Sequence, residues 1–336
     1  MYPTCKLVQG SKFSAVYDLD RRQLYRFDSA YYPLFSELEK GSWSEGAEQS
    51  LEPDAAKQVS VVLEMAQTYE IVYRTADPAG DMFEALSEEW HSPHELQNCI
   101  VDVGDKDHDW TALRASLDEL RCLGLQIRCF SDLVNLQKML EILDVFGGSC
   151  VANLQFVIRW NAELDAVDWG EVCSRYKNLL FVKLHGAQTE RKISWQQFPA
   201  MMDRLVIHEP KQIASERDCG AIVEGSLSAP SAKLFAELHS FNGCLHRKIS
   251  VRQDGSICNC PSLRASYGTD LAKLPEISAK KEFRAYWALK KDDMAVCSRC
   301  EFRYVCTDCR GYLGSDLSLE KPARCKYDPD TGLWDD

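Results

Sequence analysis

The chain lacks several features that assign proteins to common functional classes. No run of about 18 apolar residues occurs, so no membrane-spanning helix is predicted. The first ten residues contain no basic segment followed by an apolar stretch, so no secretory signal is predicted either. Neither G-x-G-x-x-G nor G-x4-G-K-[ST] is present, which leaves no sign of a glycine-rich phosphate loop.

Positive charge is also scarce. Lys and Arg total 39 against 51 Asp and Glu, a formal net charge of −12. Because binding to a nucleic-acid backbone needs a basic surface, no nucleic-acid partner is expected. With no membrane segment and no signal, we expect a cytoplasmic protein without a membrane partner. In that reducing compartment, clustered cysteines favour metal binding over disulfides.

Cysteine, in contrast, is abundant, with 15 residues. Most of them are concentrated in the last third of the chain, as Cys244, Cys258, Cys260, then Cys297-x2-Cys300-x5-Cys306-x2-Cys309, and finally Cys325. A C-x2-C pair lets two thiolates from one tight turn reach the same metal centre. Seven or eight thiolates are about what two four-thiolate sites need. Zinc and [4Fe–4S] clusters both use four thiolates, and spacing alone does not separate them. Six cysteines elsewhere are expected to be small buried apolar residues: Cys5, Cys99, Cys122, Cys129, Cys150 and Cys173.

Residues 1 to 92 are predicted to form one small α+β unit. Alternating residues from Phe13 to Phe27 around a polar turn predict a β-hairpin. Helices are predicted over 33–40 and 53–67, and a short strand near Glu70–Arg74. A small sheet with helices of this size suggests a winged-helix-like module, although an unrelated α+β domain has the same periodicity.

Residues 93 to 215 have a different sequence pattern from the N-terminal unit. Apolar runs recur about every 25 residues with helical patterns between them, at Cys99–Val103, Leu125–Phe130, Leu154–Trp160, Leu179–Leu184 and Arg204–His208. This alternation predicts parallel βα units in an open or partial barrel, within an α/β fold. Ligands of such sheets bind at the carboxyl ends of the strands, where polar residues follow the runs: Asp102, Asp105, Ser131, Asp132, Trp160, Asn161, His185, Gly186, His208 and Glu209. Residues 216 to 336 then form the predicted cysteine domain.

The cysteine domain resembles the SPASM domain, which extends many radical SAM peptide-modifying enzymes and holds two auxiliary [4Fe–4S] clusters. The resemblance rests on the pattern Cys244-x10-Gly255-x4-Cys260, the dense cluster and Cys325. The family usually has three residues between the fifth and sixth cysteines of the motif, where this chain has two. The segments CSRCEFRYVCTDCR (297–310), KPARCKYDP (321–329) and GLW (332–334) are closer still to the peptide maturases encoded beside ATP-grasp ligases, the grasp-with-spasm type.

The resemblance implies two [4Fe–4S] clusters, each with its own ligands. Cluster one would use Cys297, Cys300, Cys306 and Cys325. Cluster two would use Cys244, Cys260 and Cys309 with a fourth ligand, either Cys219 or Cys258. We slightly prefer Cys219, because a fourth ligand at that position places no second metal ligand next to the Asn259-Cys260-Pro261 turn.

The radical SAM triplet C-x3-C-x2-C is absent from the whole chain. The first expected barrel strand offers only Cys99, so a degenerate radical SAM-like partial barrel that binds no S-adenosylmethionine is expected. No catalytic residue can be assigned.

The leading functional hypothesis is maturation of a ribosomally made peptide. The N-terminal module would bind the precursor beside an ATP-grasp ligase, without cleavage of S-adenosylmethionine. One alternative is a redox-active peptide-modifying enzyme, either radical SAM-like or carrying out electron transfer. The other is a zinc-stabilised scaffold protein.

Overall fold

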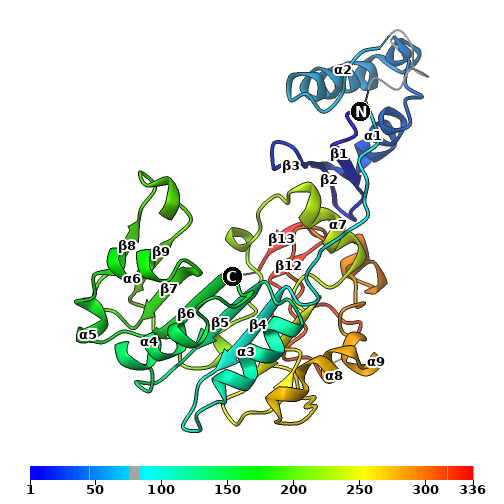
Figure 1. The fold of residues 1–336 in the computed structure, drawn as a ribbon. Helices are drawn as coiled ribbons and strands as arrows, with labels where there is room; N and C mark the ends of the chain where they lie inside the picture. Colours follow the sequence, from blue (N-terminus) through cyan, green and yellow to red (C-terminus); the bar gives the residue numbers. More distant parts are fainter. Residues whose placement is uncertain (45, 76–82, 316, 336) are drawn as a thin grey trace.

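A computed structural model describes residues 1–336 except 45, 76–82, 316 and 336. The N-terminal module begins with three antiparallel strands in the order β1-β2-β3, at Cys5–Val8, Phe13–Asp18 and Gln23–Asp28. Helices α1 (Tyr32–Glu39) and α2 (Pro53–Thr68) follow and pack on this sheet (Figure 1). The predicted hairpin and both predicted helices are confirmed. Strand β1 was not predicted.

The strand predicted near Glu70–Arg74 is wrong. Helix α2 ends in a turn in which Glu70 has a positive φ of 52°. The amides of Ile71 and Val72 both donate to the carbonyl oxygen of Ala66, at 2.8 and 3.2 Å. Ile71 and Val72 are buried in the module's core, so the apolar residues of this segment correctly indicated burial. The amides close the helix end, however, and do not join a strand ladder.

The large sheet has eight strands in the order β11-β10-β4-β5-β6-β7-β9-β8. Six of them are parallel: β4 (Asn98–Asp102), β5 (Gly124–Arg128), β6 (Asn153–Arg159), β7 (Leu179–His185), β9 (Leu205–Glu209) and β10 (Lys248–Val251). The edges β8 (Arg191–Ser194) and β11 (Ile257–Cys258) are antiparallel. The five predicted apolar runs correspond to β4, β5, β6, β7 and β9. The predicted α/β class with parallel units is therefore confirmed.

The two faces of this sheet differ in character. One face is apolar and is covered by α3 (Trp110–Glu119), α4 (Leu136–Val145), α5 (Ala162–Asp165) and α6 (Trp169–Arg175) (Figure 1). Residues such as Ile127 and Phe156 are fully buried there. The alternate positions on the same strands are polar, and Gln126 donates to Gln155 at 3.0 Å across β5 and β6. Strand periodicity thus gives the sheet one polar face.

The cysteine region contains little regular structure. Its helices are α7 (Ala232–Ser240), α8 (Leu274–Ala279) and α9 (Lys281–Arg284), and its own hairpin pairs β12 (Tyr327–Asp328) with β13 (Leu333–Trp334). The same region supplies β10 and β11 to the large sheet, so it is built directly onto the βα units. Among the described residues, no helix is long and apolar enough to cross a membrane.

Candidate functional site

The first thiol group consists of Cys297, Cys300, Cys306 and Cys325. Burial raises the pKa of Cys297 to about 12, and the nearby charges of Asp308, Cys306 and Cys325 add to this effect. Burial also raises the pKa of Cys300 well above its usual value, with Cys306 and Cys297 among its neighbours. Cys297 and Cys306 therefore lie near both Cys300 and Cys325, although Cys325 follows the C-x2-C pairs only after 15 further residues of chain.

The second thiol group consists of Cys219, Cys244, Cys260 and Cys309. Burial raises the pKa of Cys309 to about 12, and the other three thiols raise it further. Direct geometry supports this grouping, because a Cβ atom at Gly220 would lie 2.5 Å from Cys309 Sγ. Gly220 also has a positive φ of 91°, a conformation in which glycine carries no steric cost. The Cys219-Gly220 turn thus passes directly against Cys309.

Cys258 has a different environment. It lies on strand β11, it is fully buried, and its Sγ is 3.7 Å from the carbonyl oxygen of Ser250 on the paired strand. Cys258 is not among the charged neighbours of Cys309 or Cys244, whereas Cys219 is a neighbour of both. Cys258 lies near one member of the second group, since Cys260 is among the neighbours that raise its pKa, whereas Cys219 lies near two, Cys244 and Cys309.

The second thiol group faces the polar side of the large sheet. Lys248 on β10 is buried, and its Nζ lies 3.6 Å from Cys244 Sγ. Burial acts to lower the pKa of Lys248, but the thiols of Cys244, Cys260 and Cys219 outweigh burial and raise it. A buried ammonium next to several thiols favours their ionised, metal-binding form.

Backbone contacts join the two thiol groups. Ile222, three residues after Cys219, forms an isolated parallel bridge with Cys325. The guanidinium of Arg324 donates to the carbonyl oxygen of Cys219 at 2.9 Å. A segment of the second group is therefore bonded to the last cysteine of the first.

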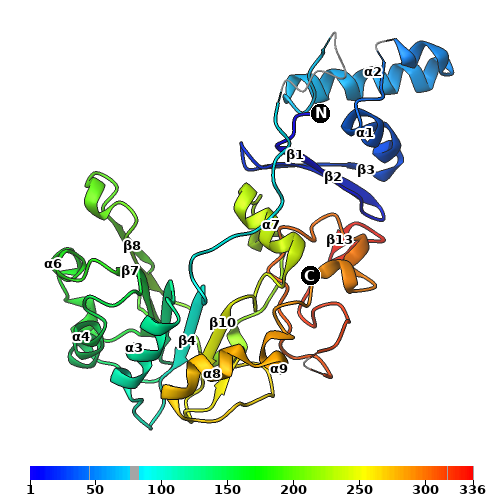
Figure 2. The same ribbon diagram turned by 45° about the vertical axis from the view of Figure 1, so that its right-hand side comes forward.

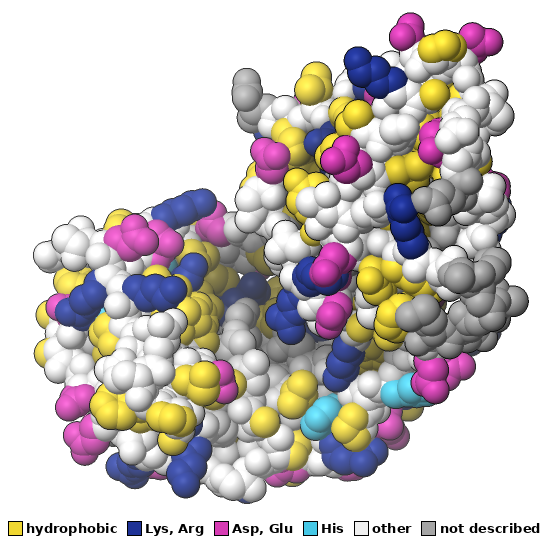
Figure 3. Space-filling model, turned by 90° about the horizontal axis from the view of Figure 1, so that it is seen from above, with side chains coloured by type: hydrophobic (Ala, Val, Ile, Leu, Met, Phe, Trp, Pro, Cys, Tyr) yellow, Lys and Arg dark blue, Asp and Glu magenta, His cyan; other side chains and the backbone are white. Residues whose placement is uncertain are grey.

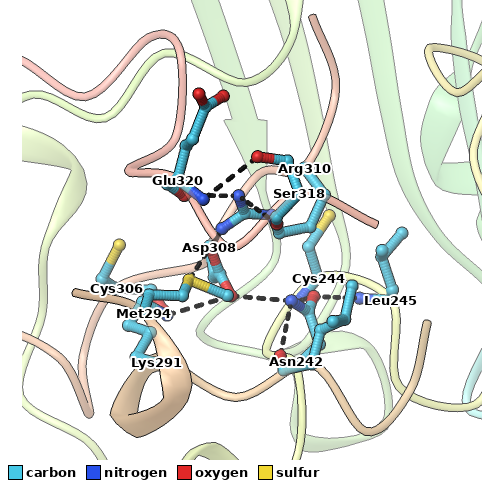
Figure 4. Close-up of polar contacts among 11 residues, drawn as sticks. Asn242, Cys244, Leu245, Lys291, Met294, Cys306, Asp308, Arg310, Ser318 and Glu320 are labelled. Carbon is cyan, nitrogen blue, oxygen red and sulfur yellow. Dashed lines mark hydrogen bonds and ion pairs between the residues drawn. The ribbon is translucent and has the colours of Figure 1, made fainter. Parts of the chain in front are cut away.

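A buried polar network also spans the two groups (Figure 4). Its centre is Asp308, which lies between Cys306 and Cys309, is fully buried and has a positive φ of 55°. Asp308 accepts hydrogen bonds from Asn242 Nδ2 at 2.7 Å and from the Arg310 guanidinium at 3.0 Å. Asn242 Oδ1 in turn accepts the amide of Cys244 at 3.0 Å.

A second cation completes this network. Lys291 Nζ lies 3.9 Å from Asp308 and donates to the carbonyl oxygen of Cys306 at 2.7 Å. One carboxylate thus orders backbone beside a cysteine of each thiol group. Asp308 was not predicted as a site residue, although the sequence places this acidic residue between two close cysteines.

Each group supplies the four cysteines that an iron–sulfur cluster would use. All 15 cysteines are free thiols. Among the described residues, no three His, Cys, Asp or Glu side chains lie close enough together to ligate one ion. In a cubane each cysteine binds a different iron, so the four sulfurs stand farther apart than around a single zinc ion. Cys297 and Cys306 of the first group and Cys309 of the second are buried, and the other five thiols are partly or fully exposed.

The other cysteines lie outside the two thiol groups. Cys99 is fully buried in the apolar core of the large sheet, on its helix-covered side. Burial raises the pKa of Cys173 to about 11, and the charge of Arg204 acts to lower it. Burial likewise raises the pKa of Cys150 to about 11, with the carboxylate of Asp118 beside it. Some of them lie near one another, since Cys122 and Cys258 are neighbours of Cys99, and Cys150 is a neighbour of Cys122.

The polar residues expected at the strand ends form separate contacts. Asp102 and Arg128 make a buried bidentate ion pair, with distances of 2.6 and 2.8 Å. His185 is buried, its Nε2 lies 3.1 Å from the carbonyl oxygen of Cys129, and burial lowers its pKa. His208 Nε2 lies 3.2 Å from Asp165. Seen from above, the molecule is hollowed between the βα units and the N-terminal module, with Lys and Arg side chains around the hollow (Figure 3).

A groove lies in the N-terminal module, between β3 and α2. It has a volume of about 410 Å³ and is lined by residues including Tyr25, Phe27, Val62, Met65 and Tyr69. A second hollow of about 480 Å³ shares Asp28 and Tyr31 with it and continues towards α1. Within the described part of the chain, no strand pairs with β3 on the side away from β2. The groove therefore combines an apolar lining with a free strand edge.

Comparisons with known proteins give little further guidance. No family model matches the sequence, and no curated protein matches it. The crystal structure of Streptococcus suis SuiB aligns over 96% of this chain and 98% of its own, with 8% identity and a TM-score of 0.32. The crystal structure of the same protein bound to S-adenosylmethionine covers 94% of this chain and 99% of its own, with 8% identity and a TM-score of 0.30. Similarity at this level does not establish a common fold.

Proposed function

We propose that this chain is an iron–sulfur protein that binds a peptide substrate in the maturation of a ribosomally synthesised peptide. The observation that carries the proposal is the convergence of eight thiols into two groups of four, in a molecule that also has a groove at a free strand edge. Cys297, Cys300, Cys306 and Cys325 would hold one [4Fe–4S] cluster, and Cys219, Cys244, Cys260 and Cys309 the other. When bound, such clusters supply structural cross-links and one-electron chemistry.

The chain's own residues prepare these sites for metal. Ligand thiols must lose their protons when metal binds, and burial alone opposes this by raising their pKa values. Lys248 beside the second group and Lys291 beside the first place buried cations where thiolate charge would develop. Cys306 and Cys309 are buried as well, which shields these two thiols from water.

Protein purified anaerobically from iron-replete cells is expected to contain about eight irons and eight sulfides per chain, as two four-thiolate cubanes require. Iron, sulfide and zinc analysis, together with visible absorbance near 400 nm, would check this. Stoichiometric zinc without sulfide would favour the zinc-stabilised scaffold instead. Cys150→Ala and Cys173→Ala, which alter thiols outside both groups, serve as controls and should keep the full metal content.

The groove supports peptide binding by strand addition. An extended peptide can pair its backbone with an exposed sheet edge while alternate side chains enter apolar pockets. Strand β3 offers that edge, and the α2 residues Val62 and Met65 form the opposite wall. The precursor of the peptide product is the proposed occupant.

Peptide binding can be tested with synthetic peptides for each short reading frame that flanks the gene, by fluorescence anisotropy. Val62→Arg should weaken binding about tenfold or more, because an unpaired charge is costly in an apolar pocket. Val61→Arg is a matched control, since Val61 is the adjacent residue of α2, is 50% exposed and is not part of the groove lining. If both variants bind as wild type does, the groove is not the site.

A partner ATP-grasp ligase and the absence of S-adenosylmethionine cleavage also belong to this proposal. The ligase rests on the resemblance of segments 297–310 and 321–329 to grasp-with-spasm proteins. The absence of cleavage rests on β4, where Cys99 lies in the apolar core and Asp102 is paired with Arg128.

Reconstituted protein given dithionite and S-adenosylmethionine is therefore expected to release no 5′-deoxyadenosine above background. Chromatography of the reaction products is the measurement. A Cys99→Ala, Cys258→Ala variant is the control. Product above the level of this control would instead support a redox-active peptide-modifying enzyme.

A further inference from the structure

Glu301 lies at the boundary between the first thiol group and the N-terminal module. It directly follows Cys300 in the chain and is fully buried. Arg26 Nε, on strand β3, donates to Glu301 Oε1 at 2.9 Å. The Tyr327 hydroxyl donates to the same carboxylate oxygen, and the Tyr17 hydroxyl donates to the carbonyl oxygen of Glu301. Two strands of the N-terminal sheet thus contact this one residue of the cysteine loop.

Arg26 connects this contact to the groove. It is one of the residues that line the groove, and it lies on the strand whose edge is free. Its guanidinium stacks on the ring of Phe13, 3.9 Å from the centroid, and also donates to the Tyr327 hydroxyl and the Gly332 carbonyl oxygen, each at 3.0 Å. A peptide in the groove would therefore contact Arg26, and a metal at Cys300 would lie next to Glu301, the ion-pair partner of Arg26.

Backbone bonds reinforce this junction. The amide of Ser11, in the β1–β2 turn, donates to the carbonyl oxygen of Arg299 at 2.8 Å. Arg299 lies between Cys297 and Cys300. The next amide, of Lys12, donates to the carbonyl oxygen of Pro329 at 3.0 Å. In Figure 2 the N-terminal sheet stands next to β13 and the cysteine region, while α2 lies at the far side of the module.

We propose that Arg26 and Glu301 are positioning residues that couple the peptide groove to the first metal site, a proposal that rests on the metal binding proposed above. Metal at Cys297, Cys300 and Cys306 would fix the loop that carries Glu301. Glu301 would then hold Arg26 and the β3 edge in one conformation. A peptide that binds an ordered edge loses less conformational entropy on binding, and linkage makes the coupling reciprocal.

Hydrogen exchange measured by mass spectrometry on the full chain, with and without iron, tests this coupling. Iron loading is expected to slow amide exchange in residues 13–28 about fivefold or more in the wild type. Arg26→Met should keep its iron but lose this slowing. Arg21→Met is the matched control, because Arg21 lies at the turn of the same hairpin and pairs with Asp18 and Glu70, not with the cysteine region. It should behave as wild type does.

Tyr327→Phe removes only one hydroxyl from the junction and should reduce the slowing without unfolding the chain. This second variant decides the test if Arg26→Met does not fold. Iron uptake without slower exchange in residues 13–28 of the wild type would overturn the coupling and leave metal binding intact. Slowing of wild-type size in both Arg26→Met and Tyr327→Phe would also overturn it. A chain that takes up no iron overturns the proposed metal function, and the coupling with it.

Discussion

Asp308→Ala is expected to empty both metal sites and to lower the free energy of unfolding of the cysteine region by about 3–5 kcal/mol, the range for removing one partner of a buried ion pair. Asp308 is fully buried, and the Arg310 guanidinium that it balances is buried as well. Without the carboxylate, two cations, Arg310 and Lys291, would remain in a site that excludes water. That cost arises whether or not metal is present.

The effect on metal binding follows from Asn242, the hydrogen-bond partner of Asp308. Asn242 is held by Asp308 and itself holds the amides of Cys244 and Leu245 at 3.0 and 2.9 Å. Loss of Asp308 would free the turn that presents Cys244 to the second group and release Lys291 from its place beside Cys306 of the first. A single substitution is therefore expected to disturb ligands of both clusters.

Asp330→Ala is the control for this substitution. Asp330 pairs with Arg299 at 2.7 Å in the same region, but both side chains are nearly half exposed. Removing an exposed pair changes stability by about 0–1 kcal/mol. Denaturant unfolding and iron content measured on both variants give the comparison. An Asp308→Ala protein that keeps eight irons and wild-type stability would show that the network does not organise the sites.

Much of the large sheet could be predicted from sequence, for a local reason. Its parallel strands are short apolar runs, such as Leu154 to Ile158, separated by helices that bury the same face. The same reasoning gave the wrong result for the segment after Tyr69. Ile71 and Val72 are apolar and buried, but their amides cap helix α2. Apolar character predicts burial more reliably than it predicts the hydrogen-bond partner.

The site was only partly predictable, because its decisive contacts are non-local. Close spacing identified the pairs Cys297 with Cys300 and Cys306 with Cys309. Spacing cannot show that Glu301 meets Arg26, which lies 275 residues away, or that Ile222 bridges to Cys325. The groove depended equally on tertiary packing, since the hairpin was visible in the sequence but its alignment along α2 was not. Lys248 was hidden inside a strand that reads as ordinary sheet.

The choice between Cys219 and Cys258 was left open by the sequence and leads to a sharp prediction. Cys219→Ala is expected to remove the second cluster, about four of eight irons, while Cys258→Ala keeps all eight. Cys219 is a charged neighbour of both Cys244 and Cys309, and the adjacent Gly220 packs against Cys309 Sγ. Cys258 is buried in β11 with its Sγ directed to Ser250, so alanine there removes one small buried group.

Cys219→Ala should also be less stable than Cys258→Ala. Metal-binding energy at a closed thiolate site contributes directly to folding, so Cys219→Ala should leave the segment around residues 217–222 open to proteolysis. Cys258→Ala should cost about 1 kcal/mol, the usual scale for a small loss of core packing. Iron analysis and limited proteolysis, run on both variants beside Cys173→Ala, provide the measurement. Loss of four irons from Cys258→Ala, with full iron in Cys219→Ala, would reverse the assignment and place the fourth ligand on β11.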